Sequence, residues 1–280
     1  MSVQDRPLSI PWFTTTTLLQ LGALLLGLHT FLPKVWAREL TYNVWIAIPL
    51  AIFIGHAFMG MFEWGFHRWT LHSVLFTWFA SFADAHREHH QLTKISTRQL
   101  DPGPGRVIIS QFDMDEPGKF EDSAFPPWAL VGFWAFFSLF IVPVHFLLPR
   151  YPILIGGYSA VALSYWLYEV IHSIHHYPQK WWEPKLSHPR FGEFWRRVFG
   201  FHRMHHYRKR SNMAVGGLLG FWAWDVAFGT YVHPRKLLVE GNVITAEDTI
   251  VPSPPGWVAW MDDYVDRHER RYRVSQQKKL

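Results

Sequence analysis

The chain has 280 residues and no cysteine, and 49% of its residues are hydrophobic and 18% aromatic at a net charge of +5. The lack of cysteine excludes thiolate metal sites, disulfides and iron–sulfur clusters, so any metal ligands must be nitrogen or oxygen atoms. The aromatic and apolar content is unlike that of an average soluble domain and favours a membrane protein. The positive charge does not indicate a nucleic-acid partner, because Lys and Arg are spread over membrane-proximal segments, where anionic lipid head groups attract them.

Four apolar segments approach the length of about 20 residues that a membrane-spanning helix needs. They are residues 12–32, 41–62, 125–148 and 151–171. Short connections pair them into two hairpins, and a soluble protein with fully buried helices is the alternative. The start "MSVQDRPLSIPW" lacks the features of a cleavable signal peptide, so we expect the first span to be retained as an anchor.

The short connections carry only Lys34, Arg38 and Arg150, whereas Lys and Arg are frequent in the long polar segments 63–124 and 172–280. Because cytoplasmic loops near a membrane collect positive charge, both polar segments are expected on the cytoplasmic side of a bacterial inner membrane or the endoplasmic reticulum. We therefore predict an all-α integral membrane protein with about four transmembrane helices and a cytosolic helical cap.

No linker divides the chain, so residues 1–280 are expected to form a single membrane domain. Residues 100–127 are punctuated by Pro and Gly and rich in acidic residues, which predicts a loop. Residues 233–280 are expected to be a polar C-terminal tail whose charged end is frayed.

The pattern His-x-x-His-His occurs three times, at residues 86–90, 172–176 and 202–206. A random chain of this composition would contain roughly 0.06 such triplets, so chance does not explain them. On a helix, positions i, i+3 and i+4 lie on one face, and imidazole is the commonest protein metal ligand. Each triplet is therefore expected to converge on one point, as half of the ligand shell of a metal ion.

A fourth element, "HRWTLH", places His67 and His72 five residues apart. On an α-helix this spacing turns the second side chain about 140° from the first, which suits two ions side by side better than one. The four elements contain more histidines than one ion of four to six ligands can use, so two metal ions are expected. An all-imidazole shell suits iron, copper or zinc, and the spacing does not rank them.

The remaining histidines are isolated in the sequence. We expect no ligand role for His29, His145, His188, His233 and His268. His56 lies within the second apolar segment and is either a polar packing residue or part of a functional pathway.

The ordered boxes "HRWTLH", "HREHH", "HSIHH" and "HRMHH" resemble those of the membrane fatty acid hydroxylase and sterol desaturase superfamily. The later stretch "FWAWDVAFGTY" is similar to the Trp-Asp-x-x-Phe-Gly-Thr ending of that family. The resemblance covers about residues 55–232, the expected catalytic region, and within the superfamily it is nearest to the sphingolipid fatty acid 2-hydroxylases.

The resemblance implies two iron ions, for which zinc can substitute during purification. It implies as ligands His67, His72, His86, His89, His90, His172, His176, His202, His205 and His206. In the third box the family pattern is Tyr-x-x-x-His-x-x-x-His, which Tyr168, His172 and His176 match, so that His175 is left over as an extra histidine. No catalytic residue beyond the metal ligands is indicated.

The implied activity is O2-dependent hydroxylation or desaturation of an unactivated C–H bond in a fatty acyl, sphingolipid or sterol-like lipid. The fused cytochrome b5-type domain of the family is missing, so we expect a separate electron donor: a cytochrome b5-like protein, a ferredoxin or a reductase. Aromatic residues near the boxes are expected either to line a lipid channel or to anchor the chain at the membrane interface. They are Trp64, Trp69, Phe82, Trp166, Tyr168 and Trp222.

Two other classes of protein remain open. A membrane zinc hydrolase would need a metal-bound water as its nucleophile. A metal transporter or store would be expected to hold its ions near the middle of the bilayer, whereas these boxes lie at the edge of the apolar segments. Lipid-dependent oxygen consumption would separate the oxygenase from both.

Overall fold

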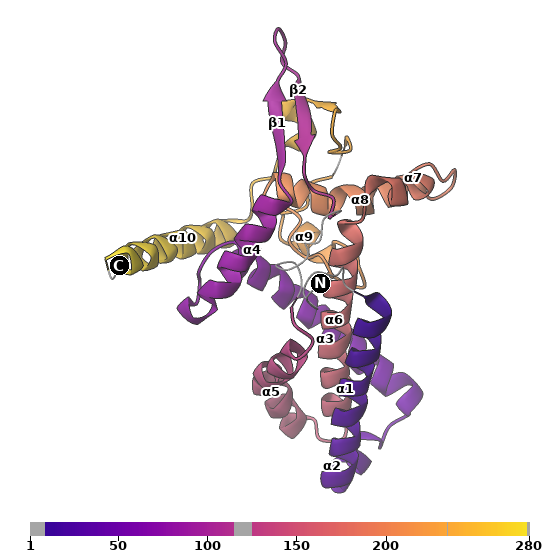
Figure 1. The fold of residues 1–280 in the computed structure, drawn as a ribbon. Coiled ribbons are helices and arrows are strands. Elements are labelled where there is room, and N and C mark those ends of the chain that lie inside the picture. The colour runs from indigo at the N-terminus through magenta and orange to yellow at the C-terminus, as the bar shows by residue number, and fades with distance from the viewer. Residues whose placement is uncertain (1–8, 115–124, 234, 279–280) are drawn as a thin grey trace, which may run out of the picture.

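The computed structural model describes residues 9–114, 125–233 and 235–278, and this part of the chain is mostly helical (Figure 1). Its α-helices are α1 (Ile10–Phe31), α2 (Pro33–Glu39), α3 (Val44–Phe66), α4 (Ala80–Leu92), α5 (Ala129–Leu147), α6 (Ile153–His175), α7 (Gln179–Leu186), α8 (Gly192–Tyr207), α9 (Ala223–Ala227) and α10 (Gly256–Gln277). A π-helical turn, His67–Leu71, continues α3, and 3₁₀ turns span Thr77–Phe79 and Ala246–Thr249.

Four of these helices are long and apolar enough to cross a membrane, which confirms that part of the sequence prediction. They are α1, α3 with its π-helical turn, α5 and α6. Helix α6 is central, because it contacts α1, α3 and α5. Its apolar window is 61% buried, compared with 11% for α1 and for α3. The outer helices therefore expose apolar side chains over most of their surface, as helices that face lipid do.

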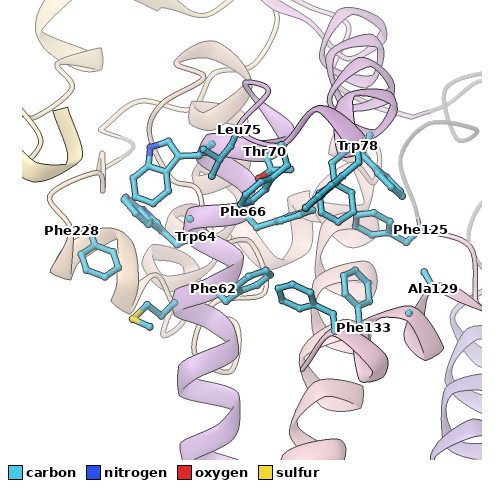
Figure 2. A pocket seen from close by; sticks show the side chains of 18 of the residues that line it. Phe62, Trp64, Phe66, Thr70, Leu75, Trp78, Phe125, Ala129, Phe133 and Phe228 are labelled. Carbon is cyan, nitrogen blue, oxygen red and sulfur yellow. The ribbon is translucent and has the colours of Figure 1, made fainter. Parts of the chain in front are cut away.

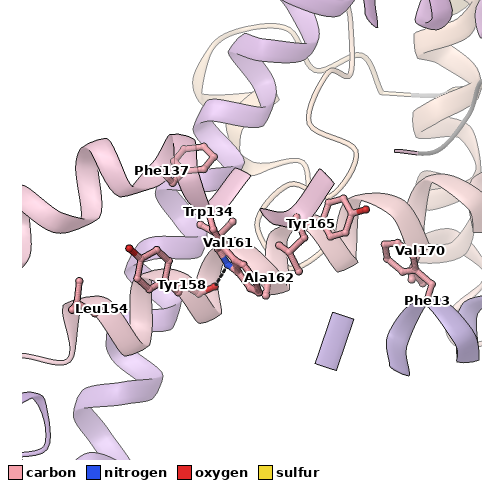
Figure 3. Close-up of a cluster of buried hydrophobic side chains, with 10 residues drawn as sticks. Phe13, Trp134, Phe137, Leu154, Tyr158, Val161, Ala162, Tyr165 and Val170 are labelled. Atoms are coloured by element: carbon pink, nitrogen blue, oxygen red, sulfur yellow. Dashed lines mark hydrogen bonds between the residues drawn. The ribbon is translucent and has the colours of Figure 1, made fainter. Parts of the chain in front are cut away.

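The core of this bundle lies where α6 packs against α1 and α5 (Figure 3). Phe13 of α1 and Phe137 of α5 are buried there with Val161 of α6. The indole of Trp134 donates a hydrogen bond of 3.0 Å to the carbonyl oxygen of Tyr158. The one polar atom of this large side chain is therefore satisfied within an apolar interior.

Small residues bring α3 and α6 close together. A Cβ atom on Gly55 would lie 2.7 Å from Cβ of Ala160, and one on Gly156 would overlap Cβ of Ala51. Such residues let the backbones of two membrane helices approach each other. The contact fixes the relative position of the two helices whose C-terminal ends carry histidine boxes.

The opposite end of α6 is held by a buried carboxylate. Glu39 of α2 accepts hydrogen bonds from the amides of Leu154 (2.8 Å) and Ile155 (2.9 Å), and it lies 2.8 Å from Nδ1 of His145 in α5. A negative group at a helix N-terminus satisfies free N–H groups and is favoured by the helix dipole. His145, isolated in the sequence, thus helps to join three helices.

A small antiparallel sheet departs from the all-α expectation. Strand β1 (Ile95–Gln99) pairs with β2 (Arg106–Ser110), and β2 pairs with β3 (Val243–Ile244). Part of the predicted loop 100–127 is therefore a strand, because its Pro and Gly residues surround a short β-branched run. Residues 115–124 of that loop lie outside the described residues.

The expectation of a frayed charged end is wrong for residues 266–277, because α10 continues to Gln277 and its Glu269 and Arg273 form ion pairs with Arg87 and Asp84 of α4. Val258 and Val265 are buried, and Asp262 forms an ion pair with Arg68. These three α10 positions share one helix face, so a sequence that is mostly charged still packs along one side.

We predict that Gly156→Val lowers the stability of the detergent-solubilised protein, because the new side chain meets Ala51 on α3. Overpacking of this kind costs about 1–3 kcal/mol. Gly22→Val on α1 is the matched control, since a Cβ there has no atom within 4 Å. Thermal unfolding should separate the two variants, and equal melting temperatures would contradict the close α3–α6 contact.

Candidate metal centre

The ten histidines expected as ligands lie together in two buried groups of five. Histidine group 1 contains His67, His72, His86, His90 and His205. Histidine group 2 contains His89, His172, His176, His202 and His206. Within each group, the nitrogen atoms that could bind a metal all lie within 4.8 Å of one another. Each group could therefore hold a metal ion.

The triplets do not converge on single points, which corrects the sequence expectation. On α4, His86 and His90 belong to histidine group 1 whereas His89 belongs to histidine group 2. On α8, His202 and His206 belong to histidine group 2, and only His205 belongs to histidine group 1. Position i+3 lies about 60° from i and 100° from i+4 around a helix. A helix that runs between the groups therefore offers two imidazoles to one and the third to the other.

The first box is π-helical, which corrects a second expectation. The amide of His72 donates to the carbonyl oxygen of His67 at 3.1 Å, and the two rings stack with centroids 5.1 Å apart. A hydrogen bond from i+5 to i places these two residues above one another. Both therefore belong to histidine group 1 instead of serving two ions side by side.

His175 lies beside histidine group 2 but outside it. Its ring stacks on that of His202 at a centroid distance of 5.4 Å, and it also contacts Trp182 and Phe201. The other histidines of the third box, His172 and His176, are one helical turn apart and reach the group. The structure therefore gives His175 a packing contact with a member of the group.

Backbone carbonyls orient four of the ten imidazoles. Nδ1 of His67 lies 2.5 Å from the oxygen of Met213, and Nδ1 of His205 lies 2.9 Å from that of Ser211. Nδ1 of His176 and of His206 contact backbone oxygens in the same way. A carbonyl oxygen can only accept, so Nδ1 of each ring carries the proton and Nε2 presents its lone pair to the group. Metal-binding histidines are usually oriented by such partners.

The Nε2 atoms are spaced as the ligands of one ion would be. In histidine group 1, Nε2 of His86 lies 3.0 Å from that of His67 and 3.1 Å from that of His90. In histidine group 2, Nε2 of His202 lies 3.1 Å from those of His176 and His206. Nitrogens held about 2.1 Å from one ion lie about 3.0–3.4 Å apart. The donor sets therefore fit a metal ion, whereas lone pairs this close would repel each other without a cation.

The imidazoles are available as neutral ligands. Burial, followed by the neighbouring histidines, holds the pKa of His86, His90 and His202 well below the ordinary 6.5. Burial lowers the pKa of His89 to about 3, and neither ring nitrogen of His89 has a hydrogen-bond partner among the described residues. Metal binding requires neutral imidazole. No proton has to leave these rings at neutral pH for an ion to bind.

The stretch "FWAWDVAFGTY" supports histidine group 1 through a buried carboxylate. Asp225 accepts hydrogen bonds from the amides of Met213 (2.7 Å) and Ala214 (2.8 Å) and from the hydroxyl of Thr230 (2.6 Å). The carbonyl of Met213 in turn faces His67. Burial raises the pKa of Asp225 above its ordinary value. Asp225 thus fixes the loop whose Met213 carbonyl orients His67. The sequence pattern of this stretch did not predict that role.

Helix α10 holds the π-helical turn through a buried ion pair. Nε and Nη2 of Arg68 bind the two carboxylate oxygens of Asp262 at 2.9 and 2.7 Å, and Trp69 donates to the same carboxylate at 3.0 Å. Arg68 also donates to the carbonyl oxygen of Arg210, in the loop after α8. Because Arg68 follows His67 directly, this ion pair fixes the segment that carries two members of histidine group 1.

An apolar cavity of about 590 Å³ opens beside histidine group 1 (Figure 2). Aromatic side chains of α3, α5 and the segment 69–82 form half of its lining. The expected lipid-channel residues Trp64, Trp69 and Phe82 lie on this lining. Trp166 and Trp222 do not line it: the first donates to Thr14, and the second stacks on Tyr231.

A second cavity, of about 60 Å³, adjoins the large cavity. It shares Phe62, Phe66, Phe125 and Phe133 with the large cavity and includes His67 and the expected residue Tyr168. Its polar lining also contains Glu63, which sequence analysis missed and whose carboxylate accepts from the amides of Gly216 (2.8 Å) and Gly217 (3.1 Å). The two cavities therefore share a wall of Phe side chains, and the smaller one reaches a member of histidine group 1.

His56 packs inside the bundle and belongs to neither group. Its Nδ1 lies 2.7 Å from the hydroxyl of Ser164, and its Nε2 accepts from the amide of Leu219 at 2.9 Å. The isolated histidines also lie outside both groups: His29, His145, His188, His233 and His268. Of the two roles that the sequence left open for His56, these contacts favour packing.

We predict that the metal content of the purified protein depends on group membership. His86→Leu and His176→Leu should each lower the metal bound per chain, because each removes a member of one group. His175→Leu should keep the wild-type content, since this ring packs beside histidine group 2 without belonging to it. Elemental analysis measures the content, and equal loss in all three variants would mean that the third box binds as a full triplet.

We also predict that Asp262→Ala weakens metal binding at histidine group 1 more than at histidine group 2. Loss of one partner of a buried ion pair costs about 3–5 kcal/mol, and Arg68 would be left unpaired beside His67. Asp263→Ala is the matched control, because this neighbour is exposed and pairs with Arg267 at the surface. Metal retention during dialysis against a chelator should distinguish them; equal retention would show that α10 does not support the centre.

Comparisons of the chain with models of protein families, with curated proteins and with solved structures find no match. The function must therefore be argued from the site itself. Its features are two neighbouring, all-imidazole groups, a support of backbone carbonyls and a buried ion pair, and a small apolar cavity that is lined by His67.

Proposed function

We propose that this chain is a membrane-bound di-iron oxygenase that hydroxylates or desaturates an unactivated C–H bond of a lipid, with O2 and external electrons. The observation that carries the proposal is a pair of adjoining apolar cavities, the smaller of which is lined by His67, beside two buried groups of five histidines. The same activity is implied by the resemblance of the histidine boxes to those of the fatty acid hydroxylase and sterol desaturase superfamily.

In the proposed arrangement, α1, α3, α5 and α6 cross the membrane and the histidine groups face the cytoplasm. The apolar exterior of these helices supports insertion, and the distribution of Lys and Arg supports the orientation. The mouth of the large cavity then lies near the membrane surface, where Trp78 and Trp128 are 76% and 71% exposed. A lipid could enter sideways without crossing water.

The lining of the large cavity matches the hydrocarbon part of a lipid. Phe and Trp side chains dominate it, and Thr70 contributes one of its few polar groups. Such a wall cannot satisfy a charged head group, so the head group would remain at the mouth while an acyl chain or ring extends inward. Its volume of about 590 Å³ is within the range of small-molecule sites, about 300–1,000 Å³.

The residues of the small cavity would position the reacting carbon and exclude water. His67 and Leu71 lie on its wall with Tyr168, whose ring stacks on His172 of histidine group 2 at 5.5 Å. Glu63 holds the loop at Gly216 and Gly217 against this wall. When bound, iron would supply the activation of O2 and the oxidation of the C–H bond, which is chemistry that the cofactor contributes.

The geometry favours an oxygenase over the two alternatives. A catalytic zinc site usually has three protein ligands and an open position, whereas each group here offers five imidazoles. A transport site would be expected near the middle of the membrane, whereas these groups lie at and beyond the ends of α3 and α6. Electrons would come from a separate donor, a cytochrome b5-like protein, a ferredoxin or a reductase.

We predict that cells producing the wild-type chain convert a lipid to a product heavier by one oxygen atom, or lighter by two hydrogen atoms. His89→Ala should abolish the product, because it removes a central member of histidine group 2. His268→Ala, a surface change on α10, should retain it. Lipidomics under ¹⁸O2 measures the outcome: label in a hydroxylated product is expected, and a product formed equally by His89→Ala would contradict the proposal.

A further inference from the structure

Helix α10 has three different faces, and docking on the rest of the protein accounts for the residues of only one of them. Val258, Asp262 and Val265 point into the protein. A second face carries charged, exposed residues, among them Asp263 and Arg270. The third face is aromatic and lies between these two.

The aromatic face consists of Trp257, Trp260 and Tyr264, which we call the α10 stripe. These residues are 49%, 62% and 46% exposed. Their spacing of three and four residues puts them on one side of the helix, and the rings of Trp260 and Tyr264 stack at 6.0 Å. Three large aromatic side chains in a row on an otherwise charged helix need an apolar or interfacial surrounding.

The α10 stripe is continuous with the mouth of the large cavity. Trp257 is part of the cavity lining, together with the exposed Trp78 and Trp128. Figure 1 shows α10 extending crosswise to α1 and α6, at the end of the bundle where α4 and α8 lie. A helix in this position would run along a membrane that the bundle crosses.

We propose that α10 lies in the membrane interface, with the α10 stripe against lipid and the face of Asp263 and Arg270 against water. An interfacial helix has an aromatic and apolar side buried about 5–10 Å at the head groups and a charged side in solution. Trp and Tyr prefer this depth because their rings are apolar and their tips are polar. The partner is therefore the lipid surface itself, at the place where a lipid would enter the cavity.

This inference rests on the proposed membrane placement of the bundle, and the test separates the two. Because the chain has no cysteine, single nitroxide labels can be attached to the metal-loaded protein without removing any native thiol. Trp260→Cys and Tyr264→Cys report the α10 stripe. Asp263→Cys and Arg270→Cys are matched controls on another side of the same helix, and Leu139→Cys, at an exposed position on α5, reports insertion of the bundle.

The measurement is the accessibility of each label to O2, which concentrates in lipid, and to a water-soluble nickel chelate, in nanodiscs that hold one chain each. Labels at 260 and 264 should show an O2-to-nickel ratio several-fold above those at 263 and 270, and below that at 139, which lies in the middle of α5. A nickel-accessible stripe beside a lipid-accessible label at 139 would overturn the inference alone. A stripe closed to both reagents would show that protein covers it and would overturn it equally. A nickel-accessible label at 139 would contradict the membrane placement itself.

Discussion

Ten imidazoles that point their lone pairs at two small volumes are the constraint on which the rest of this structure depends. Nε2 atoms 3.0–3.2 Å apart repel one another unless a cation lies between them. Burial removes the water that would otherwise screen them and holds the pKa of His89 at about 3. The fold must therefore hold these rings in place by other contacts, and a bound metal would convert their repulsion into attraction.

Several unrelated contacts provide that support. Backbone carbonyls at Met213 and Ser211 orient rings of histidine group 1, and Asp225 fixes the loop that contains the first of them. The small-residue contact between α3 and α6 sets the distance between boxes on different helices. The ion pair of Arg68 with Asp262 ties the π-helical turn to α10. The docking of α10 is thus a condition for the geometry of the centre, although its sequence is typical of a surface tail.

The sequence was sufficient for the features that depend on local pattern. Apolar length predicted the four long helices, and the spacing of the boxes identified the histidines that meet in the two groups. The division of each triplet could not be predicted, because it depends on which side of α4 and α8 each group lies. The π-helical turn at His67 contains one more residue than an α-helical turn would. No amino-acid preference in the sequence predicts this insertion. The roles of Asp225 and Asp262 depend on Ala214 and Arg68, which lie 11 and 194 residues away from them along the chain.

The central claim is that the chain holds two ions, one in each histidine group. Anomalous diffraction at the iron edge, from crystals of the iron-loaded protein, tests it most directly. The account predicts two anomalous peaks per chain, one among His67, His72, His86, His90 and His205 and the other among His89, His172, His176, His202 and His206. A single peak, or a peak that lies at His175 or His145 instead, would contradict it.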